Sequence, residues 1–526
     1  MNYSSHLNLR HASQAEPIMG KSMVENNAGG FVFQIDDWAR LGRFLVLGSE
    51  GGTYYTGERE LTRDNAEAVI RCIVANGPRV VQEVVELSHS GRAPKNDPAL
   101  FVLALAASLG SDETRRFALL NLSRVARTGT HLMTFAKYAD SMRGWGRGLK
   151  RAIGDWYNEM DAEKLALQIV KYRSRAGWTH DDLLRVSHPK GKSSAHSALY
   201  AWIAKDEVTG DLPALIPAFI EMQAATDVKT VVELLEQNSD LPWETVPTEL
   251  LKSPQVWEVL LPRMGLTALI RNLGRMSANG LIVPLSGASR TVANRLSSAM
   301  ALTKARVHPI AVLSALLTYQ SGHGVRGSLS WDPVREVVDA LDSAFYLAFG
   351  NVRPVGKPMV LALDVSGSMG DGQVAGVPGL TPRIASAAMA LVTARTERDY
   401  HLMAFGDEFH PIDISPRMRL DDVVRRISDL PFGGTDCALP MQWALERKVR
   451  TDGFVVLTDN ETWAGGIHPC QALAEYRRTM GIAAKLAVVG MTATEFSIAD
   501  PSDAGMLDVV GFDTAAPNII ADHIRA

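Results

Sequence analysis

The 526-residue sequence predicts two parts, an all-α array of helical repeats followed by a doubly wound, Rossmann-like α/β domain. Apolar residues recur three and four positions apart from Asp36 to about Phe349, without any long strand-like alternation. After Gly350, apolar runs with the length of strands alternate with helical segments over about 170 residues, which is typical of a doubly wound sheet.

The first part begins with a polar, aperiodic stretch, and we expect residues 1–27 to form a loose N-terminal tail. Thr62 is placed to cap the first clear amphipathic helix. Similar segments follow at 98–109, 112–125, 132–142, 162–170, 212–222, 228–235 and 266–273. Consecutive short helices of this kind predict a HEAT-like solenoid over residues 28–355.

The second part, residues 356–526, is predicted from its alternating pattern. The predicted strands are 359–364, 400–405, 454–458 and 484–490. The predicted helices are 384–395, 420–430, 438–447 and 469–479. Because the first strand is apolar throughout and ends in Asp364, it is typical of a buried parallel strand with a polar site at its end.

The net charge of −4 hides an uneven distribution. Residues 115–192 carry 16 basic and 7 acidic side chains, a net of +9, and residues 252–306 carry 8 and 1, a net of +7. Residues 356–526 carry 15 and 22, a net of −7. Segregated basic stretches are typical of nucleic-acid binding, although they can also be solvated helix faces that never meet.

Composition excludes several classes of protein. Cys72, Cys437 and Cys470 lie far apart, with no CxxC spacing, so neither a disulfide framework nor a zinc site is expected. The first residues lack the apolar core of a signal peptide, and the longest apolar runs are too short to span a bilayer. We therefore expect a cytoplasmic protein without a membrane segment.

Three polar motifs lie at expected strand ends or in loops at the same edge of the sheet. They are Asp364-Val-Ser-Gly-Ser, Gly433-Gly-Thr-Asp and Thr458-Asp-Asn-Glu. Their carboxylates and hydroxyls form an oxygen-only set, which hard ions prefer, chiefly Mg²⁺ and sometimes Mn²⁺ or Ca²⁺. An empty or purely structural site stays open as an alternative. An aspartyl-phosphate hydrolase is disfavoured because residue 366 is Ser rather than a second acid.

In their order, these motifs resemble the metal-ion-dependent adhesion site of von Willebrand factor A-type domains. The resemblance implies that Asp364, Ser366, Ser368 and Thr435 contact the metal. It implies that Asp459 acts directly or through water. The roles of Asp436 and Glu461 stay open.

Residues 143–157 and 170–188 mix basic side chains with aromatic ones. Basic groups can neutralise phosphates, and aromatic planes can stack on unpaired bases. For Trp145, Trp156 and Trp178 we favour core packing instead, because large aromatic side chains mostly serve cores.

Longer strings resemble the Ro ribonucleoprotein autoantigen family, in its bacterial form, from about residue 30 to the end. They include RGWGRGLKRAIGDWY, KYRSRAGWTHDDLLRVSH, GLTALIRNLGRM, LDVSGSM and TDNETWAGG. The resemblance implies a monomeric ring of HEAT-like repeats, the TROVE module, closed by the A-type domain. It implies binding of small noncoding Y RNAs and of single-stranded 3′ ends of misfolded RNAs, without catalysis. It also implies a part in RNA quality control, ribosomal RNA maturation or RNA degradation, with polynucleotide phosphorylase tethered through RNA.

The resemblance implies that Lys171, Arg175 and His188 contact RNA. On charge grounds we add Arg143, Arg147, Lys150, Arg151, Lys190 and Lys192. Two other functions stay open. The chain could be a protein-interaction scaffold whose metal grips an acidic side chain of a partner, or a metal-dependent hydrolase, for which no paired metal site or activated nucleophile is evident.

Overall fold

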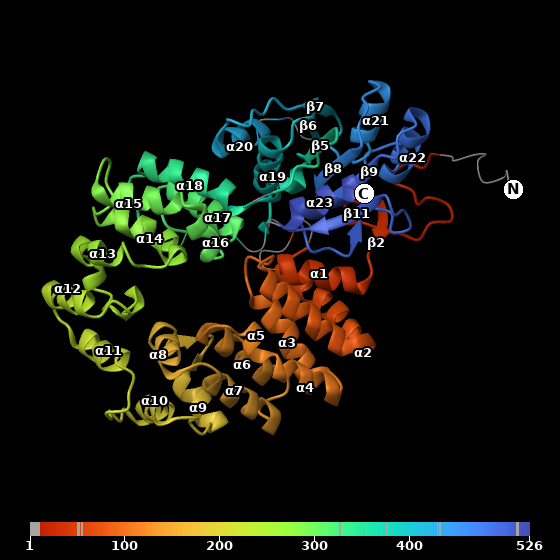
Figure 1. Cartoon of the computed structure of the whole chain (residues 1–526). Coiled ribbons are helices and arrows are strands. Elements are labelled where there is room, and N and C mark those ends of the chain that lie inside the picture. Colours follow the sequence, from red (N-terminus) through yellow and green to blue (C-terminus); the bar gives the residue numbers. More distant parts are fainter. Residues whose placement is uncertain are drawn as a thin grey trace. The chain divides into compact units, whose positions relative to one another are not determined.

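The computed structural model describes residues 11–49, 53, 56–325, 328–350, 352–374, 377–428, 430, 433–511 and 515–526. Its contacts divide the chain into two compact units (Figure 1). The first, called here the α/β unit, comprises Met1–Ala68, Arg92–Pro94 and Phe349–Ala526. The second, called the helical unit, comprises Val69–Gly91 and Lys95–Ala348. The chain therefore enters the helical unit from the α/β unit and returns to it.

The helical unit confirms the predicted all-α array. Its main helices are α3 (Asp97–Leu109), α4 (Asp112–Leu120), α5 (Leu122–Val125), α6 (Gly129–Met142), α7 (Arg147–Glu159), α8 (Ala162–Lys171), α9 (His180–Ser187), α10 (Ser194–Lys205), α11 (Leu215–Ala224), α12 (Val228–Gln237), α13 (Pro254–Leu260), α14 (Leu266–Ala278), α15 (Gly287–Leu296), α16 (Ala299–Lys304), α17 (Pro309–Gln320) and α18 (Arg335–Ala348). A short hairpin, β3 (Ser174–Arg175) and β4 (Trp178–Thr179), interrupts the helices. The long α2 (Glu58–Ser90) precedes them and has non-helical backbone at Asn76, two residues before Pro78.

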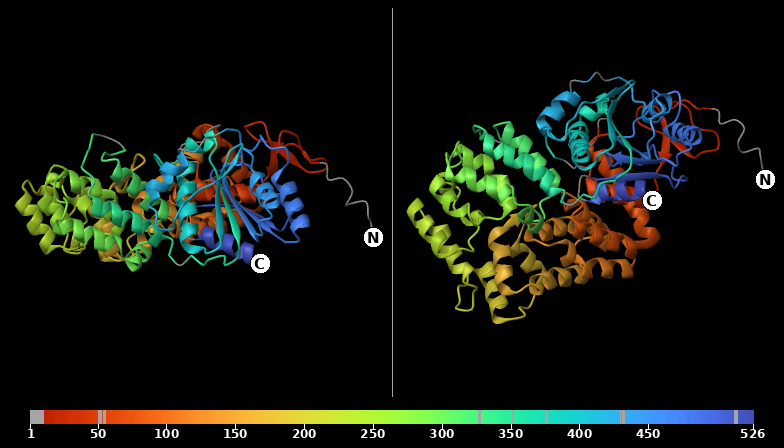
Figure 2. Two further views of the ribbon diagram at one scale, coloured as in Figure 1. Left: turned by 90° about the horizontal axis from the view of Figure 1, so that it is seen from above. Right: turned by 45° about the horizontal axis from the view of Figure 1, so that its top comes forward.

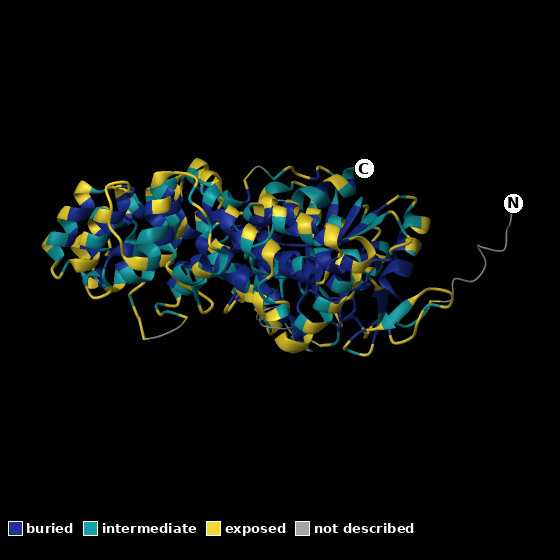
Figure 3. Ribbon diagram, turned by 90° about the horizontal axis from the view of Figure 1, so that it is seen from below, coloured by how far each residue is buried: buried dark blue, intermediate teal, exposed yellow. Residues whose placement is uncertain are grey.

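Polar residues start many of these helices. The side chains of Ser111, Thr128 and Asp161 each accept a hydrogen bond from a backbone N–H in the first turn of α4, α6 and α8. At α9, Thr179 and Asp182 form a reciprocal capping box. Many helices have a buried side and an exposed side (Figure 3), which is the arrangement expected when short amphipathic helices stack.

The three tryptophans near the basic residues are placed differently from one another. Trp156 is buried, and its indole N–H donates to the carbonyl of Ala126 at 2.6 Å, so core packing is confirmed for it. Trp145 and Trp178 are only half-buried, and their ring centroids lie 5.1 Å apart. These two join the segment before α7 to the β3–β4 hairpin, and are not anchors of the core.

The α/β unit has a six-stranded sheet in the order β11-β9-β8-β5-β6-β7. The strands are β5 (Met359–Asp364), β6 (Tyr400–Phe405), β7 (Phe409–Pro411), β8 (Gly453–Thr458), β9 (Lys485–Gly490) and β11 (Met506–Val510). Only the edge strand β7 runs antiparallel to its neighbour. The helices of this unit are α1 (Asp37–Leu47), α19 (Pro382–Thr396), α20 (Leu420–Ser428), α21 (Leu439–Glu446), α22 (Pro469–Met480) and α23 (Ala515–Arg525). The predicted doubly wound class is confirmed, with helices over both faces of the sheet (Figure 2).

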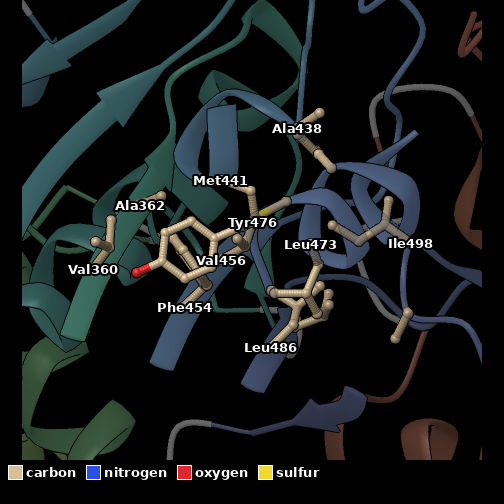
Figure 4. Close-up of a cluster of buried hydrophobic side chains, with 14 of the residues drawn as sticks. Val360, Ala362, Ala438, Met441, Phe454, Val456, Leu473, Tyr476, Leu486 and Ile498 are labelled. Carbon is tan, nitrogen blue, oxygen red and sulfur yellow. The ribbon is translucent and has the colours of Figure 1, made fainter. Parts of the chain in front are cut away.

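Alternate residues of the buried strands face opposite sides of the sheet. Val360 and Ala362 belong to a core cluster with Phe454, Val456 and residues of α21 and α22 (Figure 4). Met359 and Leu361 instead lie beside α19 and α23. Burial on both faces explains why these strands are continuously apolar in the sequence.

The segment before α1 differs from the expected loose tail. Residues 1–10 lie outside the described residues, but β1 (Met23–Glu25) and β2 (Phe31–Gln34) form a small antiparallel sheet with β10 (Phe496–Ser497). Val32 is part of the core cluster. A Cβ added at Gly30 would lie 1.8 Å from the carbonyl oxygen of Thr462, so only glycine permits this close approach. We call residues 11–34 the N-terminal strap.

No helix among the described residues is long and apolar enough to cross a membrane.

Candidate functional site

The sheet register brings two acidic motifs to one edge. Asp364 is the last residue of β5, and Leu363 pairs with Leu457 of the neighbouring strand β8. Asp459 follows β8 directly. Since the two strands are parallel, both carboxylates lie at the carboxyl edge of the sheet, where ligand sites of such folds form.

Asp364 is fully buried and organises the first motif. One of its carboxylate oxygens accepts a hydrogen bond from the backbone N–H of Ser366 at 2.9 Å. The other accepts one from the hydroxyl of Thr458 at 2.6 Å. The hydroxyls of Ser366 and Ser368 lie 3.2 Å apart, and Ser368 hydrogen-bonds to the Asp459 carboxyl. Four of the five predicted metal ligands are thus joined in one cluster.

Thr435, the fifth predicted ligand, lies buried in the loop before α21. Its carbonyl oxygen accepts hydrogen bonds from the backbone N–H groups of Trp463 and Ala464, both at 3.0 Å. The backbone N–H of Asp436 donates to the carbonyl of Gly406 at 2.8 Å. These bonds tie the Thr435 loop to the segment that follows Asp459 and to the residue that follows β6.

The cluster holds more negative charge than its surroundings neutralise. Burial and the nearby Asp364 and Glu461 carboxylates raise the pKa of Asp459 to about 8. Burial also raises the pKa of Asp364, and it raises that of Glu461 to about 7. The guanidinium of Arg383 acts in the opposite sense on Asp364. A bound divalent cation would favour the ionised carboxylates, so this imbalance fits the predicted kind of ligand.

A recess of about 20 Å³ lies beside the cluster and is lined by Ser368, Asp371 and Asp459, among others. A space of that size admits one water-sized particle. In the described part of the chain, no three His, Cys, Asp or Glu side chains are grouped as metal donors. Three of the five donors proposed here are hydroxyls, which is the ligand balance of an oxygen-only site with few carboxylates.

The two uncertain acids are engaged by the N-terminal strap. The Gln14 side-chain amide donates to Asp436 at 2.7 Å and to the carbonyl of Ile467 at 2.8 Å. The Asn27 amide donates to Glu461 at 2.6 Å, and the backbone N–H of Ala28 donates to its other oxygen at 3.1 Å. Asp436 and Glu461 therefore help to fix the loops, and we keep them out of the ligand set.

Several residues of this centre were missed by the sequence analysis. Thr458 and Arg383 carried a signal, because Thr458 ends a predicted strand beside Asp459 and Arg383 lies next to a predicted helix. Arg383 donates to the carbonyls of Val365 and Ser366 at 3.0 Å each and so holds the first loop. Gln14 carried no signal, because its partners lie more than 420 residues away in the sequence.

The predicted RNA-binding residues form a second feature, in the helical unit. Arg147, Lys150 and Arg151 lie on the first turns of α7. The segment carrying Lys190 and Lys192 lies over the other end of the same helix. There Asn158 donates to the carbonyl of Lys190 at 2.9 Å and accepts from the backbone N–H of Lys192 at 3.0 Å.

Arg143 and Arg175 lie on other elements than α7. Arg143 caps the end of α6, four residues before α7 begins. Arg175 lies on the hairpin whose Trp178 contacts Trp145. His188 ends α9 in the left-handed conformation, with φ 49°, and is exposed.

Most of these side chains are not neutralised. Within the described residues, the side chains of six make no hydrogen bond or ion pair: Arg147, Lys150, Arg151, Arg175, His188 and Lys190. Lys192 differs because its ammonium donates to the carbonyls of Glu159 and Met160 at 3.3 and 2.8 Å. Arg143 donates to the carbonyl of Ser108 at 3.3 Å.

Lys171 shows that the two basic stretches of the sequence meet. Its ammonium lies 4.0 Å from the carboxylate of Glu244, which is also within electrostatic reach of Arg271 from the second stretch. Burial raises the pKa of Glu244 despite both cations. Arg263 and Arg295 of the second stretch instead donate to backbone carbonyls at 2.5 Å, so these two serve the helical packing.

Comparisons with known proteins agree with this architecture. The chain matches the family model of the TROVE domain over residues 24–211 and 236–318, and that of the Ro60 vWA domain over residues 358–524. It is 45% identical over 515 residues to the RNA-binding protein RO60 of Deinococcus radiodurans, covering 96% of each chain. It is 34% identical over 582 residues to the RNA-binding protein RO60 of Caenorhabditis elegans, covering 95% of this chain and 90% of the relative. The crystal structure of the Deinococcus radiodurans RO (RSR) protein matches with a TM-score of 0.72 and 45% identity, over 93% of this chain and 99% of that one.

Proposed function

The chain belongs to the Ro family, in which a TROVE domain is joined to a Ro60 vWA domain, and from this premise we propose that it binds RNA without catalysing a reaction. The single observation that supports this most is the group of unneutralised cations around α7, most of them exposed. Cations without carboxylate partners are free to neutralise phosphates, and their contacts with phosphate dominate the affinity of such proteins.

The proposed RNA ligands are small noncoding Y RNAs and single-stranded 3′ ends of misfolded RNAs. Lys171, Arg175 and His188 are the proposed central contacts, and the cations of α7 and of residues 190–192 are the outer ones. We place this activity in the cytoplasm, in RNA quality control, ribosomal RNA maturation or RNA degradation. Polynucleotide phosphorylase is the proposed partner, held through RNA.

The α/β unit is proposed to hold one divalent cation, with Mg²⁺ favoured over Mn²⁺ and Ca²⁺. Asp364, Ser366, Ser368 and Thr435 would hold it, and Asp459 would act directly or through water. When bound, the ion supplies a position that attracts an anionic group. Asp436 and Glu461 keep the surrounding loops in place through the N-terminal strap.

Replacing Lys171, Arg175 and His188 together by alanine tests the RNA proposal. Each charge-assisted contact contributes about 1.5–3 kcal/mol, so losing two cations should weaken Y RNA binding about 100-fold or more. The dependence of log affinity on log salt should flatten by about two. Gel shifts at several salt concentrations measure both quantities.

The matched control replaces Lys164 and Arg185 by alanine. These two neighbouring cations are exposed but paired, with carboxylate oxygens of Asp161 and Asp181 each at 2.8 Å. Because their charges are already neutralised, the control should bind RNA within about threefold of the wild type. Equal loss in both variants, or no loss in the first, would reject the proposed contacts.

A protein-interaction scaffold is the second candidate function. The recess beside Ser368 and Asp459 favours it, because a metal there could be reached by a partner's acidic side chain. Capture of a protein partner that depends on Mg²⁺ but is unaffected by ribonuclease would support this alternative over the RNA proposal.

A further inference from the structure

The helical unit contains a basic cavity that joins two of the proposed RNA contacts, Arg143 and Arg147, to arginines outside that set. It has a volume of about 330 Å³ and lies where the end of α6 and the start of α7 meet α3 and α4. Four arginines line it, namely Arg115 and Arg116 of α4, Arg143 after α6, and Arg147 of α7. We call it the arginine cavity.

The charges around the arginine cavity are strongly unbalanced. Asp112 is the only acidic residue among its lining residues, and its carboxylate pairs with Arg115 at 3.0 Å. Among the described residues, the side chain of Arg143 donates to the carbonyl of Ser108 alone, which is a neutral acceptor. Arg116 and Arg147 have no hydrogen bond or ion pair within the described part of the chain. The lining therefore carries a net charge of +3, four arginines less one aspartate.

The backbone of α7 adds to this preference for an anion. The helix begins after Gly146 without a side-chain cap, and no acidic residue lies in its first turn. Its first N–H groups belong to Arg147, Gly148 and Leu149, which line the cavity. Uncapped N–H groups and the helix dipole both attract negative charge. A Cβ at Gly146 would meet nothing within 4 Å, so the space above this turn is open.

The shape of the site limits what anion fits. Phosphates inside a duplex lie along a convex rod, and exposed cations on a helix face suffice to contact them. A concave site lined by four guanidinium groups suits an end group that can enter it, and guanidinium groups bind phosphate oxygens in pairs. A terminal phosphomonoester carries more charge than an internal phosphodiester, as the dianionic form of a phosphate monoester does. Leu119 and Leu149 supply apolar wall for the adjoining nucleoside.

We propose that the arginine cavity binds the terminal phosphomonoester of an RNA strand. This inference rests on the proposed function, because it assumes that the helical unit binds RNA. It adds a preference for phosphorylated ends that the cations outside the cavity do not supply.

The test compares three forms of one single-stranded RNA: one with hydroxyls at both ends, one with a 5′-phosphate and one with a 3′-phosphate. Fluorescence anisotropy with the full-length protein at fixed salt gives the three dissociation constants. A terminal phosphate at the preferred end should tighten binding about 10-fold, as expected for one additional multiply bonded anion. In Arg116→Gln, Arg147→Gln and the double variant, that advantage should shrink or vanish.

Lys137→Gln is the matched control. Lys137 lies on α6, is exposed, has no partner among the described residues, and does not line the cavity. Its loss should weaken binding of all three RNAs by a similar factor and preserve the ratio between them. Thermal melting of each variant checks the fold, which should be unchanged because Arg116 and Arg147 are exposed.

Each outcome decides a different point. If the wild type binds all three RNAs tightly and equally, or if the double variant keeps the advantage, the inference is overturned while RNA binding stands. If none of the RNAs binds, the proposed function itself fails. Adenosine monophosphate and inorganic phosphate are added as competitors. Removal of the phosphate advantage by micromolar adenosine monophosphate would assign the cavity to free nucleotides and overturn its assignment to RNA ends.

Discussion

The acidic cluster of the α/β unit and the basic surface of the helical unit are opposites in construction. The first consists of buried carboxylates and hydroxyls that hydrogen-bond to one another and to backbone. The second consists mostly of exposed side chains, and five of its cations, Arg147, Lys150, Arg151, Arg175 and Lys190, make no side-chain interaction within the described residues. Like charges gathered in a buried cluster destabilise the fold, whereas exposed cations hardly affect it.

This contrast shows in which unit the same residues determine both ligand binding and the stability of the fold. In the α/β unit, a ligand changes the energy of groups that also hold the loops together. In the helical unit, ligand contacts can be removed without disturbing packing, except where a cation also bonds to backbone, as Lys192 does. Substitutions in the two units should therefore have different signatures, which the following experiments measure.

The largest effect is expected for Asp364→Asn. The neutral amide has the shape of the carboxyl but removes a buried negative charge, so Mn²⁺ affinity should fall at least about 100-fold, or roughly 3 kcal/mol. Without metal, the stability should stay within about 1 kcal/mol of the wild type, because burial already disfavours the charge. Calorimetric titration measures the Mn²⁺ affinity, and thermal melting in the presence of a chelator measures the stability of the metal-free protein. Asp399 gives the control, because it is exposed and lies just before β6, at the edge of the sheet away from the cluster; Asp399→Asn should keep Mn²⁺ binding. Retained binding in Asp364→Asn would contradict the ligand assignment.

Acidification should destabilise the helical unit through His180. Its imidazole is buried, lies 2.7 Å from the Tyr157 hydroxyl, and has its pKa lowered by burial to about 4. The unfolded chain takes up this proton near pH 6.5 but the folded chain only near pH 4. Stability is therefore fully present above pH 6.5 and falls as the pH drops, by about 3 kcal/mol at pH 4.

Urea unfolding of the wild type and of His180→Gln between pH 7 and pH 4.5 tests this. The variant should show a shallower loss of stability on acidification. Burial also lowers the pKa of His131 to about 4, so this residue contributes in the same direction. A double variant that replaces both His180 and His131 by glutamine should lose stability still more gradually on acidification. If the free energy of unfolding changed with pH equally in all three proteins, buried histidines would not be the cause of the acid sensitivity.

A smaller loss is expected when the N-terminal strap is weakened. Gln14→Ala removes the donors to Asp436 and Ile467 and the acceptor for Gly465, and leaves buried polar atoms without partners. We expect about 2 kcal/mol of destabilisation and less than a 10-fold loss of Mn²⁺ affinity. Gln34→Ala, at an exposed position of β2, should change neither. Unaltered unfolding of Gln14→Ala would show that the strap does not hold the loops.

The smallest expected effect is a difference in stability between variants of two neighbouring lysines, Lys190 and Lys192. Lys192→Ala should lower stability by about 0.5 kcal/mol, because its ammonium donates to two carbonyls at the end of α7. Lys190→Ala should leave stability unchanged, since Lys190 is exposed. Both variants should flatten the salt dependence of RNA binding by about one. Unequal slopes would assign only one of the lysines to RNA.

The sequence predicted the helices, whose hydrogen bonds are local, and the strands that are buried on both faces of the sheet. The buried strands β5, β6, β8 and β9 and their helices were predicted within a few residues of their observed bounds. The strands β7 and β11 were missed, because β7 has three residues at an edge and β11 is only partly buried. The strand β2 was missed because it pairs with β10, about 460 residues later.

Contacts between residues far apart in the sequence were also what the sequence could not predict at the two sites. The motifs pointed to an oxygen-only site at one sheet edge, and their resemblance to von Willebrand factor A-type domains implied the five proposed ligands. It could not reveal that Gln14 and Asn27 hold the acids between them, since no local pattern encodes such distant contacts. Charge counting found the cations of α7, but not that Lys171 faces Glu244 or that four arginines enclose a cavity.

The N-terminal strap has a consequence for how the protein is made. Its residues bond to partners between Asp436 and Ser502, so on the nascent chain the strap must wait for partners that are made at least 422 residues later. At 5–20 residues per second, that wait is about 20–90 s. During this interval Val32 and Phe33, which are buried in the finished protein, lack the β10 partner and most of the core that covers them. A chaperone that shields short apolar segments on nascent chains would therefore raise the yield of native protein.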